Sequence, residues 1–155
     1  IDPRTYNLCP QKLEAKLIRA QKDNSLPKIV VPVHLTGQPC DMAAIHALGK
    51  KYGFKIIEDA SHSIGGKYRG EFIGNSRYSD VTVFSFHPVK IITTAEGGMA
   101  TTNDDALAAS LALLRAFPHA DVTGGWVGGR ALTRSSERST HSSMRSSTKP
   151  ERGPW

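Results

Sequence analysis

The sequence predicts an α/β fold, with a mixed and mostly parallel sheet and flanking helices, from three observations. Apolar runs rich in β-branched residues, typical of buried strands, alternate with segments whose apolar residues recur at helical spacing. A strand, a helix and a second strand follow one another with short links over residues 28–60, which favours parallel strands in a βαβ unit. The length of 155 residues suits one domain with a sizeable core.

Three helices are predicted from their apolar spacing and from the residues at their ends. The first has Pro10 in its first turn. The second is capped by Asp41 and ends at Gly53. The last is capped by Asn103 or Asp104. Their apolar faces hold Leu13 and Leu17, then Met42, Ile45, Leu48 and Tyr52, and finally Leu107, Leu111 and Leu114.

The strands are predicted from β-branched content and period-two alternation. They lie at residues 28–35, 54–60 and 80–87, with residues 97–103 as an antiparallel partner of the third. Pro32 weakens the first of them, because proline donates no hydrogen bond to a ladder. Residues 67–74 predict a hairpin or turn around Gly70.

Composition excludes several classes of protein. With 39% hydrophobic and 22% charged residues the chain is typical of globular proteins, its apolar runs are too short to span a membrane, and no signal peptide opens it. Cys9 and Cys40 fit no disulfide or metal pattern, so we expect a reducing, cytoplasmic location. The chain opens on Ile1 rather than methionine, and we expect it to begin inside a longer protein.

The character of the chain changes after Phe117. Residues 118–155 are rich in Gly, Ser, Thr and Arg and carry six Lys or Arg against three Asp or Glu, which is half of the net charge of +6. Such a segment buries too little apolar surface to offset its chain entropy, so we expect disorder. It is either a regulated Ser/Arg tail or an unrelated C-terminus joined to a truncated domain. Without aromatic interleaving, it predicts no nucleic-acid binding.

Asp59 and Lys90 are the first candidates for chemistry. Asp59 ends the apolar strand in "KIIEDASH", where ligands collect beyond the carboxyl ends of parallel strands. An acid there binds an NAD ribose only after a G-x-G-x-x-G turn, which is missing upstream. Lys90 follows 31 residues later in "VFSFHPVKIITTAEGG", among apolar residues whose desolvation favours a neutral, nucleophilic amine. The scattered histidines predict no metal site.

Together the two residues match the requirements of pyridoxal 5′-phosphate (PLP), which needs a lysine amine and an acid at its pyridine nitrogen. The structural alternative stays open at this point. In that alternative Lys90 extends from a strand end toward solvent and Asp59 caps a turn.

Three longer segments carry a resemblance to a known family: "VVPVHLTGQPCDMAAI", "IIEDASHSIGGKYRGEFIG" and "DVTVFSFHPVKIITTAEGGMATTND". They resemble the DegT/DnrJ family of PLP-dependent sugar aminotransferases over about residues 1–115. The resemblance implies part of the large domain of a fold-type I aminotransferase in residues 1–117. The segment "SFHPVKIITTAEGG" is most similar to the branch that aminates C4 of a UDP-linked 4-keto-6-deoxy-N-acetylhexosamine, on the way to pseudaminic acid-type sugars.

The resemblance also implies roles for four residues. Lys90 matches the Schiff-base lysine, and Asp59 the carboxylate at the pyridine nitrogen. His62 matches a His or Gln near the cofactor's phenolic oxygen, and Ser85 a hydroxyl that helps to hold the phosphate. By the same resemblance the amino donor is glutamate, the acceptor a keto-sugar nucleotide, and the full-length parent a homodimer.

Two alternatives to this function remain. The first is a truncated, non-catalytic remnant that binds PLP or a sugar nucleotide weakly, because the family's main phosphate loop would precede Ile1 and its C-terminal domain would follow Phe117. The second is a sugar dehydratase of the same family, which Lys90 disfavours because such dehydratases have histidine at that position.

Overall fold

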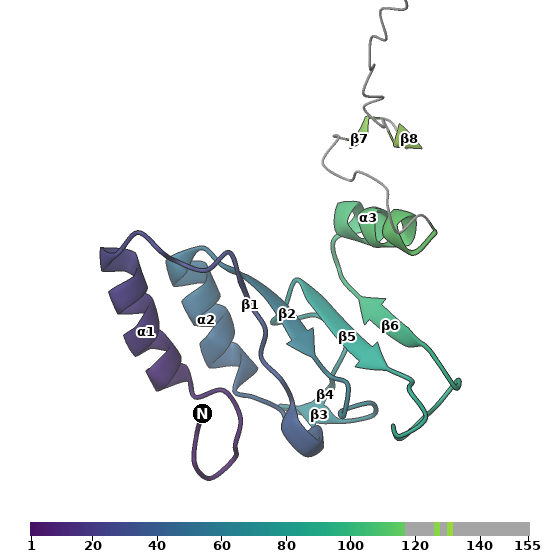
Figure 1. Ribbon diagram of the computed structural model, residues 1–155, viewed down its shortest axis with the longest axis horizontal. Helices are drawn as coiled ribbons and strands as arrows, with labels where there is room; N and C mark the ends of the chain where they lie inside the picture. Colours follow the sequence, from purple (N-terminus) through teal and green to yellow (C-terminus); the bar gives the residue numbers. More distant parts are fainter. Residues whose placement is uncertain (117–125, 128–129, 132–155) are drawn as a thin grey trace, which may run out of the picture. The chain divides into compact units, whose positions relative to one another are not determined.

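A computed structural model describes residues 1–116, 126–127 and 130–131, and its chain divides into two units, residues 1–120 and 121–155. In the first unit four strands form one sheet in the order β1-β2-β5-β6. They are β1 (Ile29–Val30), β2 (Lys55–Asp59), β5 (Val81–Ser85) and β6 (Gly98–Thr101). The pairs β1–β2 and β2–β5 are parallel and β5–β6 is antiparallel, so the predicted mixed, mostly parallel sheet is confirmed (Figure 1).

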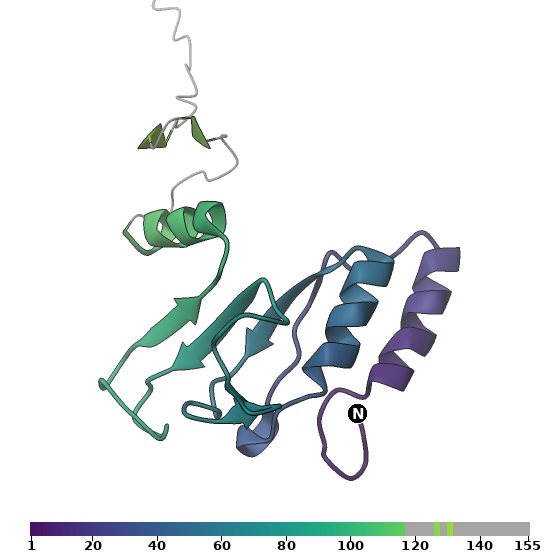
Figure 2. The same ribbon diagram turned by 180° about the vertical axis from the view of Figure 1, so that it is seen from behind.

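Two helices pack on one face of this sheet. They are α1 (Pro10–Lys22) and α2 (Met42–Tyr52), which lie side by side in both views (Figures 1 and 2). Asp41 Oδ1 accepts a hydrogen bond from the N–H of Ala44, and Gly53 ends α2 with a left-handed φ of 78°. The buried core between helices and sheet consists of Leu17, Cys40, Met42, Ile45, Leu48, Tyr52, Phe54 and Ile56.

The remaining elements of the first unit are short or lie beyond the sheet. A 3-10 turn, η1 (Leu35–Gly37), follows β1, and helix α3 (Asp105–Ala116) follows β6. The predicted hairpin is formed by β3 (Lys67–Tyr68) and β4 (Glu71–Phe72). It is tied to the start of α2, because the hydroxyl of Tyr68 donates a 2.6 Å hydrogen bond to Asp41.

The structure differs from the sequence prediction at the ends of two elements, the first strand and the last helix. The strand expected at 28–35 is limited to Ile29–Val30, followed by a single bridge between Val33 and Asp59, because Pro32 has no N–H to continue the ladder. The cap of α3 is Asp104, whose Oδ1 accepts from the N–H of Leu107 at 2.9 Å, whereas Asn103 donates to the carbonyl of Asn75.

The disorder expected in residues 118–155 falls outside the described residues, apart from two short strands of the second unit. These are β7 (Trp126–Val127) and β8 (Arg130–Ala131), which pair antiparallel. In the part of the chain that the structure describes, no helix is long and apolar enough to cross a membrane.

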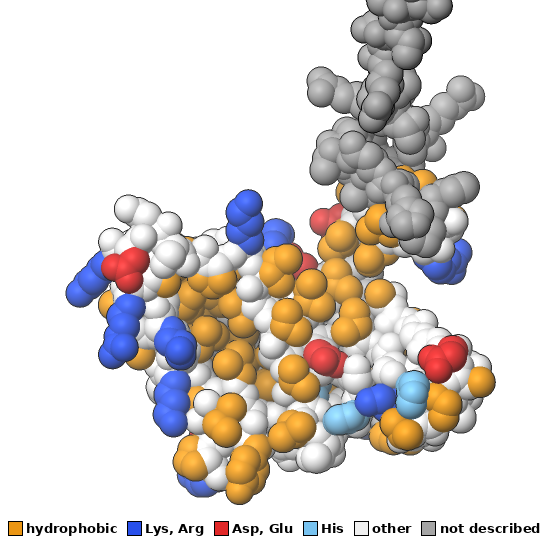
Figure 3. All heavy atoms as spheres, in the orientation of Figure 1, with side chains coloured by type: hydrophobic (Ala, Val, Ile, Leu, Met, Phe, Trp, Pro, Cys, Tyr) orange, Lys and Arg blue, Asp and Glu red, His pale blue; other side chains and the backbone are white. Residues whose placement is uncertain are grey.

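Within residues 1–116, the second face of the sheet is exposed at β1. Ile29 of β1 alternates with Val30, which packs against the core, and Ile29 and the following Val31 are each 51% exposed. Figure 3 shows hydrophobic side chains gathered over the strands on this side of the molecule. The parallel register places the side chain of Asp59 on the same face as that of its partner Val83.

Candidate active site

Asp59 and Ser85 lie on one face of the sheet, at the carboxyl ends of two neighbouring parallel strands. Asp59 is the last residue of β2 and pairs with Val83 of β5. Ser85 is two residues further along β5, so its side chain points to the same face. In open α/β sheets this edge is where ligands bind. The structure therefore brings these two predicted site residues to one edge.

The carboxylate of Asp59 is half-buried and has a single hydrogen bond within residues 1–116. Its Oδ1 accepts from the N–H of Ser61 at 3.0 Å, which fixes the turn after β2. No ion pair to Asp59 occurs among the described residues. A partly desolvated carboxylate without a cation is suited to receive a positively charged ligand group.

Lys90 lies in the loop that joins β5 to β6. The loop is closed at its base by two backbone hydrogen bonds, from Phe86 N–H to the carbonyl of Gly97 (2.8 Å) and from Thr94 N–H to the carbonyl of Phe86 (3.0 Å). Within it the N–H of Lys90 donates to the carbonyl of His87 at 2.9 Å, which forms a turn. The lysine is thus presented by a closed loop at the end of the strand that carries Ser85.

Lys90 and His62 line one hollow of about 200 Å³ at this edge. Its lining residues are Thr36, Ser61, His62, Val89, Lys90 and Ile91. They come from the segments that follow β1, β2 and β5. Gly37, with a φ of 89°, backs the wall, since a Cβ there would lie 3.0 Å from the carbonyl oxygen of His62. All four predicted site residues therefore gather at the carboxyl edge, two of them in the hollow.

The prediction that Lys90 lies among desolvating apolar residues is wrong for its neighbours in sequence. Val89 is 79% exposed and Ile91 71% exposed, and Ile92 is exposed as well. These residues sit in a loop beyond the sheet edge, where no helix of the described chain covers them. Within the described residues, the loop itself therefore does not surround the lysine with buried apolar side chains.

A buried polar cluster behind the site was missed by the sequence analysis. His34 is fully buried, and its Nε2 lies 2.7 Å from Oε1 of Glu58. The other oxygen of Glu58 accepts hydrogen bonds from Ser79 (2.8 Å) and Thr82 (3.0 Å). The signal was present, because period-two alternation places Glu58 on the same buried side of β2 as Ile56.

The hydrogen bonds of this cluster stabilise the ionised form of Glu58. Burial acts to raise the pKa of the Glu58 carboxyl. The hydrogen bonds from His34, Ser79 and Thr82 outweigh burial, so the pKa of Glu58 is held below its ordinary value of 4.5. A negative charge is therefore fixed behind the strand that carries Asp59.

The donor set at the carboxyl edge fits PLP in part. It offers a primary amine at Lys90, a half-buried carboxylate at Asp59 that has no ion pair among the described residues, and a hydroxyl at Ser85. PLP requires an amine for its attachment, an acid for its positively charged pyridine ring and hydrogen-bond donors for its phosphate. One hydroxyl is too few donors for a phosphate dianion. Among the described residues no group of three His, Cys, Asp or Glu side chains is placed to hold a metal ion.

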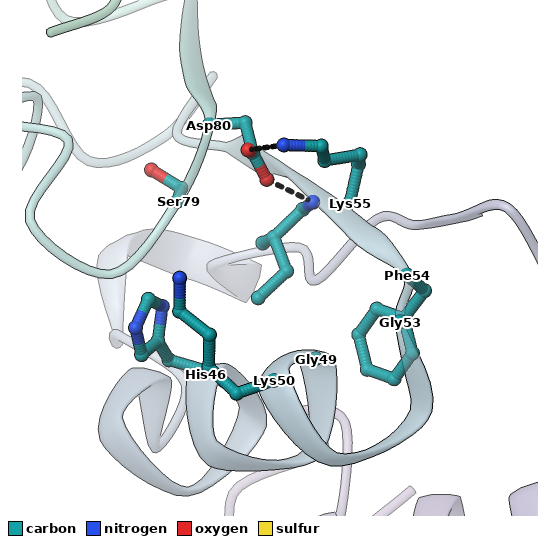
Figure 4. Close-up of a pocket in the computed structure, with 9 residues that line it drawn as sticks. His46, Gly49, Lys50, Gly53, Phe54, Lys55, Ser79 and Asp80 are labelled. Carbon is teal, nitrogen blue, oxygen red and sulfur yellow. Dashed lines mark hydrogen bonds and ion pairs between the residues drawn. The ribbon is translucent and has the colours of Figure 1, made fainter.

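A second hollow, of about 350 Å³, lies at the opposite edge of the sheet (Figure 4). It is lined by the starts of β2 and β5 and by α2, and the carboxylate of Asp80 bonds there both to Lys55 Nζ and to the N–H of Ile56, each at 2.8 Å. The carboxylate of Asp80 is thus already paired with Lys55, whereas the carboxylate of Asp59 at the carboxyl edge has no ion pair among the described residues.

The fold is that of a fold-type I, PLP-dependent aminotransferase, and the described chain corresponds to part of its large domain. The chain belongs to the DegT/DnrJ/EryC1/StrS aminotransferase family, whose model matches residues 1–128.

Three similar proteins agree with this assignment. GDP-perosamine synthase of Caulobacter vibrioides is 47% identical over 114 residues, 74% of this chain and 29% of its own length. A DegT/DnrJ/EryC1/StrS aminotransferase from Brucella abortus superposes with a TM-score of 0.71 at 32% identity, over 86% of this chain and 34% of its own. Helicobacter pylori PseC, an aminotransferase of pseudaminic acid biosynthesis, gives 0.64 at 34% identity, over 79% and 31%. The chain spans about a third of the length of each.

Proposed function

We propose that this chain carries the cofactor-binding edge of a PLP-dependent aminotransferase that transfers an amino group to a keto-sugar nucleotide. The observation that carries the proposal is the meeting of Asp59, Ser85, His62 and Lys90 at the carboxyl ends of adjacent strands. Membership of an aminotransferase family supports it independently.

Each of the four residues has a separate chemical role. PLP, when bound, supplies an aldehyde that attaches to an amine and a ring that accepts electrons. Lys90 supplies the amine for attachment and, once released, the base that moves a proton. Asp59, as a carboxylate, would face the pyridine nitrogen and keep a proton, and hence a positive charge, on that nitrogen. Ser85 donates a hydrogen bond to phosphate, and His62 contributes a ring nitrogen beside the phenolic oxygen.

The acceptor is a nucleotide-linked keto sugar, and a UDP-linked 4-keto-6-deoxy-N-acetylhexosamine is our first candidate. The similarity to PseC supports a sugar of the pseudaminic acid type, whereas the similarity to GDP-perosamine synthase favours a GDP-linked one. Glutamate is the proposed amino donor and a homodimer the proposed assembly of the whole protein. Both cysteines are free and buried, which supports a reducing, cytoplasmic location.

The cofactor assignment is tested by covalent trapping. Purified chain is incubated with PLP, reduced with borohydride and digested, and the modified lysine is identified by mass spectrometry. Lys90 is expected to carry the label. Lys90→Ala is expected to abolish the visible absorbance that PLP gains when it is bound to the lysine amine. Lys50→Ala is the matched control, because Lys50 lines the hollow at the opposite edge and offers an exposed amine. Labelling that is unchanged in Lys90→Ala overturns the assignment.

Transfer is tested separately from attachment. Chain that has been loaded with PLP but not reduced with borohydride is supplied with glutamate and with UDP- or GDP-linked 4-keto sugars, and 2-oxoglutarate is measured. Attachment at Lys90 without 2-oxoglutarate favours the non-catalytic binder over the aminotransferase for this chain.

A further inference from the structure

The buried polar cluster behind Asp59 has a defined protonation pattern. The N–H of Cys40 donates to Nδ1 of His34 at 3.2 Å, so this nitrogen is an acceptor and carries no hydrogen. The hydrogen of the neutral ring is then on Nε2, which donates to Glu58. Glu58 therefore accepts three hydrogen bonds from neutral donors, His34, Ser79 and Thr82, and we call these four residues the buried glutamate cluster.

The cluster joins segments from three neighbouring strands. His34 follows β1, Glu58 belongs to β2 and Thr82 to β5. Glu58 and Asp59 are consecutive, so their side chains point to opposite faces of the sheet. The cluster is thus on the buried face directly behind the open face that carries Asp59.

The backbone of Asp59 is held by the same segment. Its N–H donates to the carbonyl of Pro32 at 2.9 Å, and its carbonyl accepts from the N–H of His34 at 3.0 Å. This ladder is short, because Pro32 has no N–H of its own and β1 ends at Val30. The side chain of His34, bonded to Glu58, reinforces the contact where the backbone alone provides little.

We propose that the buried glutamate cluster is the positioning device that fixes Asp59 at the carboxyl edge. This inference rests on the proposed function, in which Asp59 faces PLP. His34 and Glu58 touch no ligand in this arrangement and act through Asp59. Two of its members act directly on Asp59: Glu58 precedes it in β2, and the N–H of His34 donates to its carbonyl. A contact that only stabilised the fold would not need to involve the two neighbours of this one residue.

The first test needs no cofactor. Glu58→Leu removes all three acceptor contacts, and Glu58→Gln keeps one acceptor oxygen for His34. Leu48→Ala, which truncates a buried core residue of α2 outside the cluster, is the control for general destabilisation. In Glu58→Leu the amides of His34 and Asp59 are expected to exchange with deuterium roughly 10-fold faster than wild type, relative to the change in Leu48→Ala. Glu58→Gln is expected to fall between.

The second test reads the geometry at Asp59. With PLP attached to Lys90, the pH dependence of the absorbance reports protonation of the nitrogen that links PLP to the lysine, and this protonation depends on whether the ring nitrogen keeps its own proton. Glu58→Leu and Glu58→Gln are expected to shift this profile toward that of Asp59→Asn, and Leu48→Ala to leave it at the wild-type position. Leu48→Ala and the two Glu58 variants are compared at temperatures at which every variant is folded.

The outcomes separate this inference from the proposed function. Equal exchange changes in the Glu58 variants and in Leu48→Ala overturn the positioning role, whatever PLP does. Absence of PLP at Lys90 in wild type overturns the proposed function, while faster exchange confined to the Glu58 variants still supports the positioning of Asp59. If Glu58→Leu fails to fold, the comparison of Glu58→Gln with Leu48→Ala decides.

Discussion

Asp59 and Ser85 point to the same face of the sheet from the ends of neighbouring parallel strands, although 26 positions separate them in the sequence. The pairing of Asp59 with Val83 fixes this relationship, because Ser85 is two residues beyond Val83. A slip of one residue in either strand would turn one of the two side chains to the core. The site therefore depends on strand register as much as on residue identity.

Asp59→Asn is predicted to weaken PLP binding while preserving the fold. The asparagine oxygen still accepts from the N–H of Ser61, so the turn after β2 is retained. The loss is the negative charge, and with it a charge-assisted hydrogen bond worth roughly 10- to 100-fold in affinity. Titration with PLP measures the affinity, and thermal unfolding verifies the fold. Glu96→Gln, which removes an exposed charge from the loop after Lys90, is the control and should leave affinity unchanged.

The structure of the edge could be predicted in part because its signals are local. Asp59 ends a β-branched strand and Lys90 follows a period-two strand, and both patterns place polar residues at strand ends. At Gly98 the backbones of β6 and β5 approach closely, since a Cβ there would lie 2.8 Å from the carbonyl oxygen of Phe84.

The remainder could not be predicted because it depends on tertiary contacts. The exposure of Val89 and Ile91 follows from what covers a loop, which a hydrophobic run in sequence does not specify. The pairing of His34 with Glu58 joins residues 24 positions apart, and only the parallel alignment of β1 and β2 brings them together. The roles of Asp59, His62, Ser85 and Lys90 stay predictions until they are tested chemically.

Gly98→Ala is predicted to destabilise the fold and to disturb the site. Gly98 pairs with Ser85, and the added methyl group would meet the backbone of Phe84, so β6 must move away from the end of β5. Overpacking of this kind costs about 1–3 kcal/mol of unfolding free energy. Urea unfolding measures the cost, and PLP titration should show weaker binding.

Gly70→Ala provides the comparison for that variant. Gly70 has a φ of 83°, but no atom lies within 4 Å of the position that the added methyl group would take, so only the left-handed backbone is penalised, by about 1 kcal/mol. Its PLP affinity should equal that of wild type. Equal losses of PLP affinity in both variants would contradict a specific effect of Gly98 on Ser85.

Acid is predicted to remove the stabilisation that Glu58 provides. Burial acts to raise the pKa of the Glu58 carboxyl, but the hydrogen bonds led by that from His34 hold this pKa below 4.5 in the folded state. A carboxyl whose pKa is lowered by folding stabilises the protein above its unfolded pKa, and this contribution is lost as pH falls through the folded pKa. The difference in unfolding free energy between wild type and Glu58→Gln should therefore be constant near neutral pH and shrink below about pH 4.5. Urea unfolding from pH 7 to pH 3 measures it, and a difference that grows on acidification would contradict the assignment.

Asp80→Ala is predicted to cost much more stability than Lys55→Ala, although the two side chains form an ion pair at 2.8 Å (Figure 4). Asp80 also accepts from the N–H of Ile56 at 2.8 Å, which joins the starts of β2 and β5, and loss of a bond to a charged acceptor costs about 1.5–3 kcal/mol. Lys55 is largely exposed, so its removal leaves that backbone bond intact and should cost less than about 1 kcal/mol. Urea unfolding of both variants in low and high salt measures the contrast. Equal losses that both vanish in high salt would instead make the ion pair, rather than the backbone bond, the dominant contribution of Asp80.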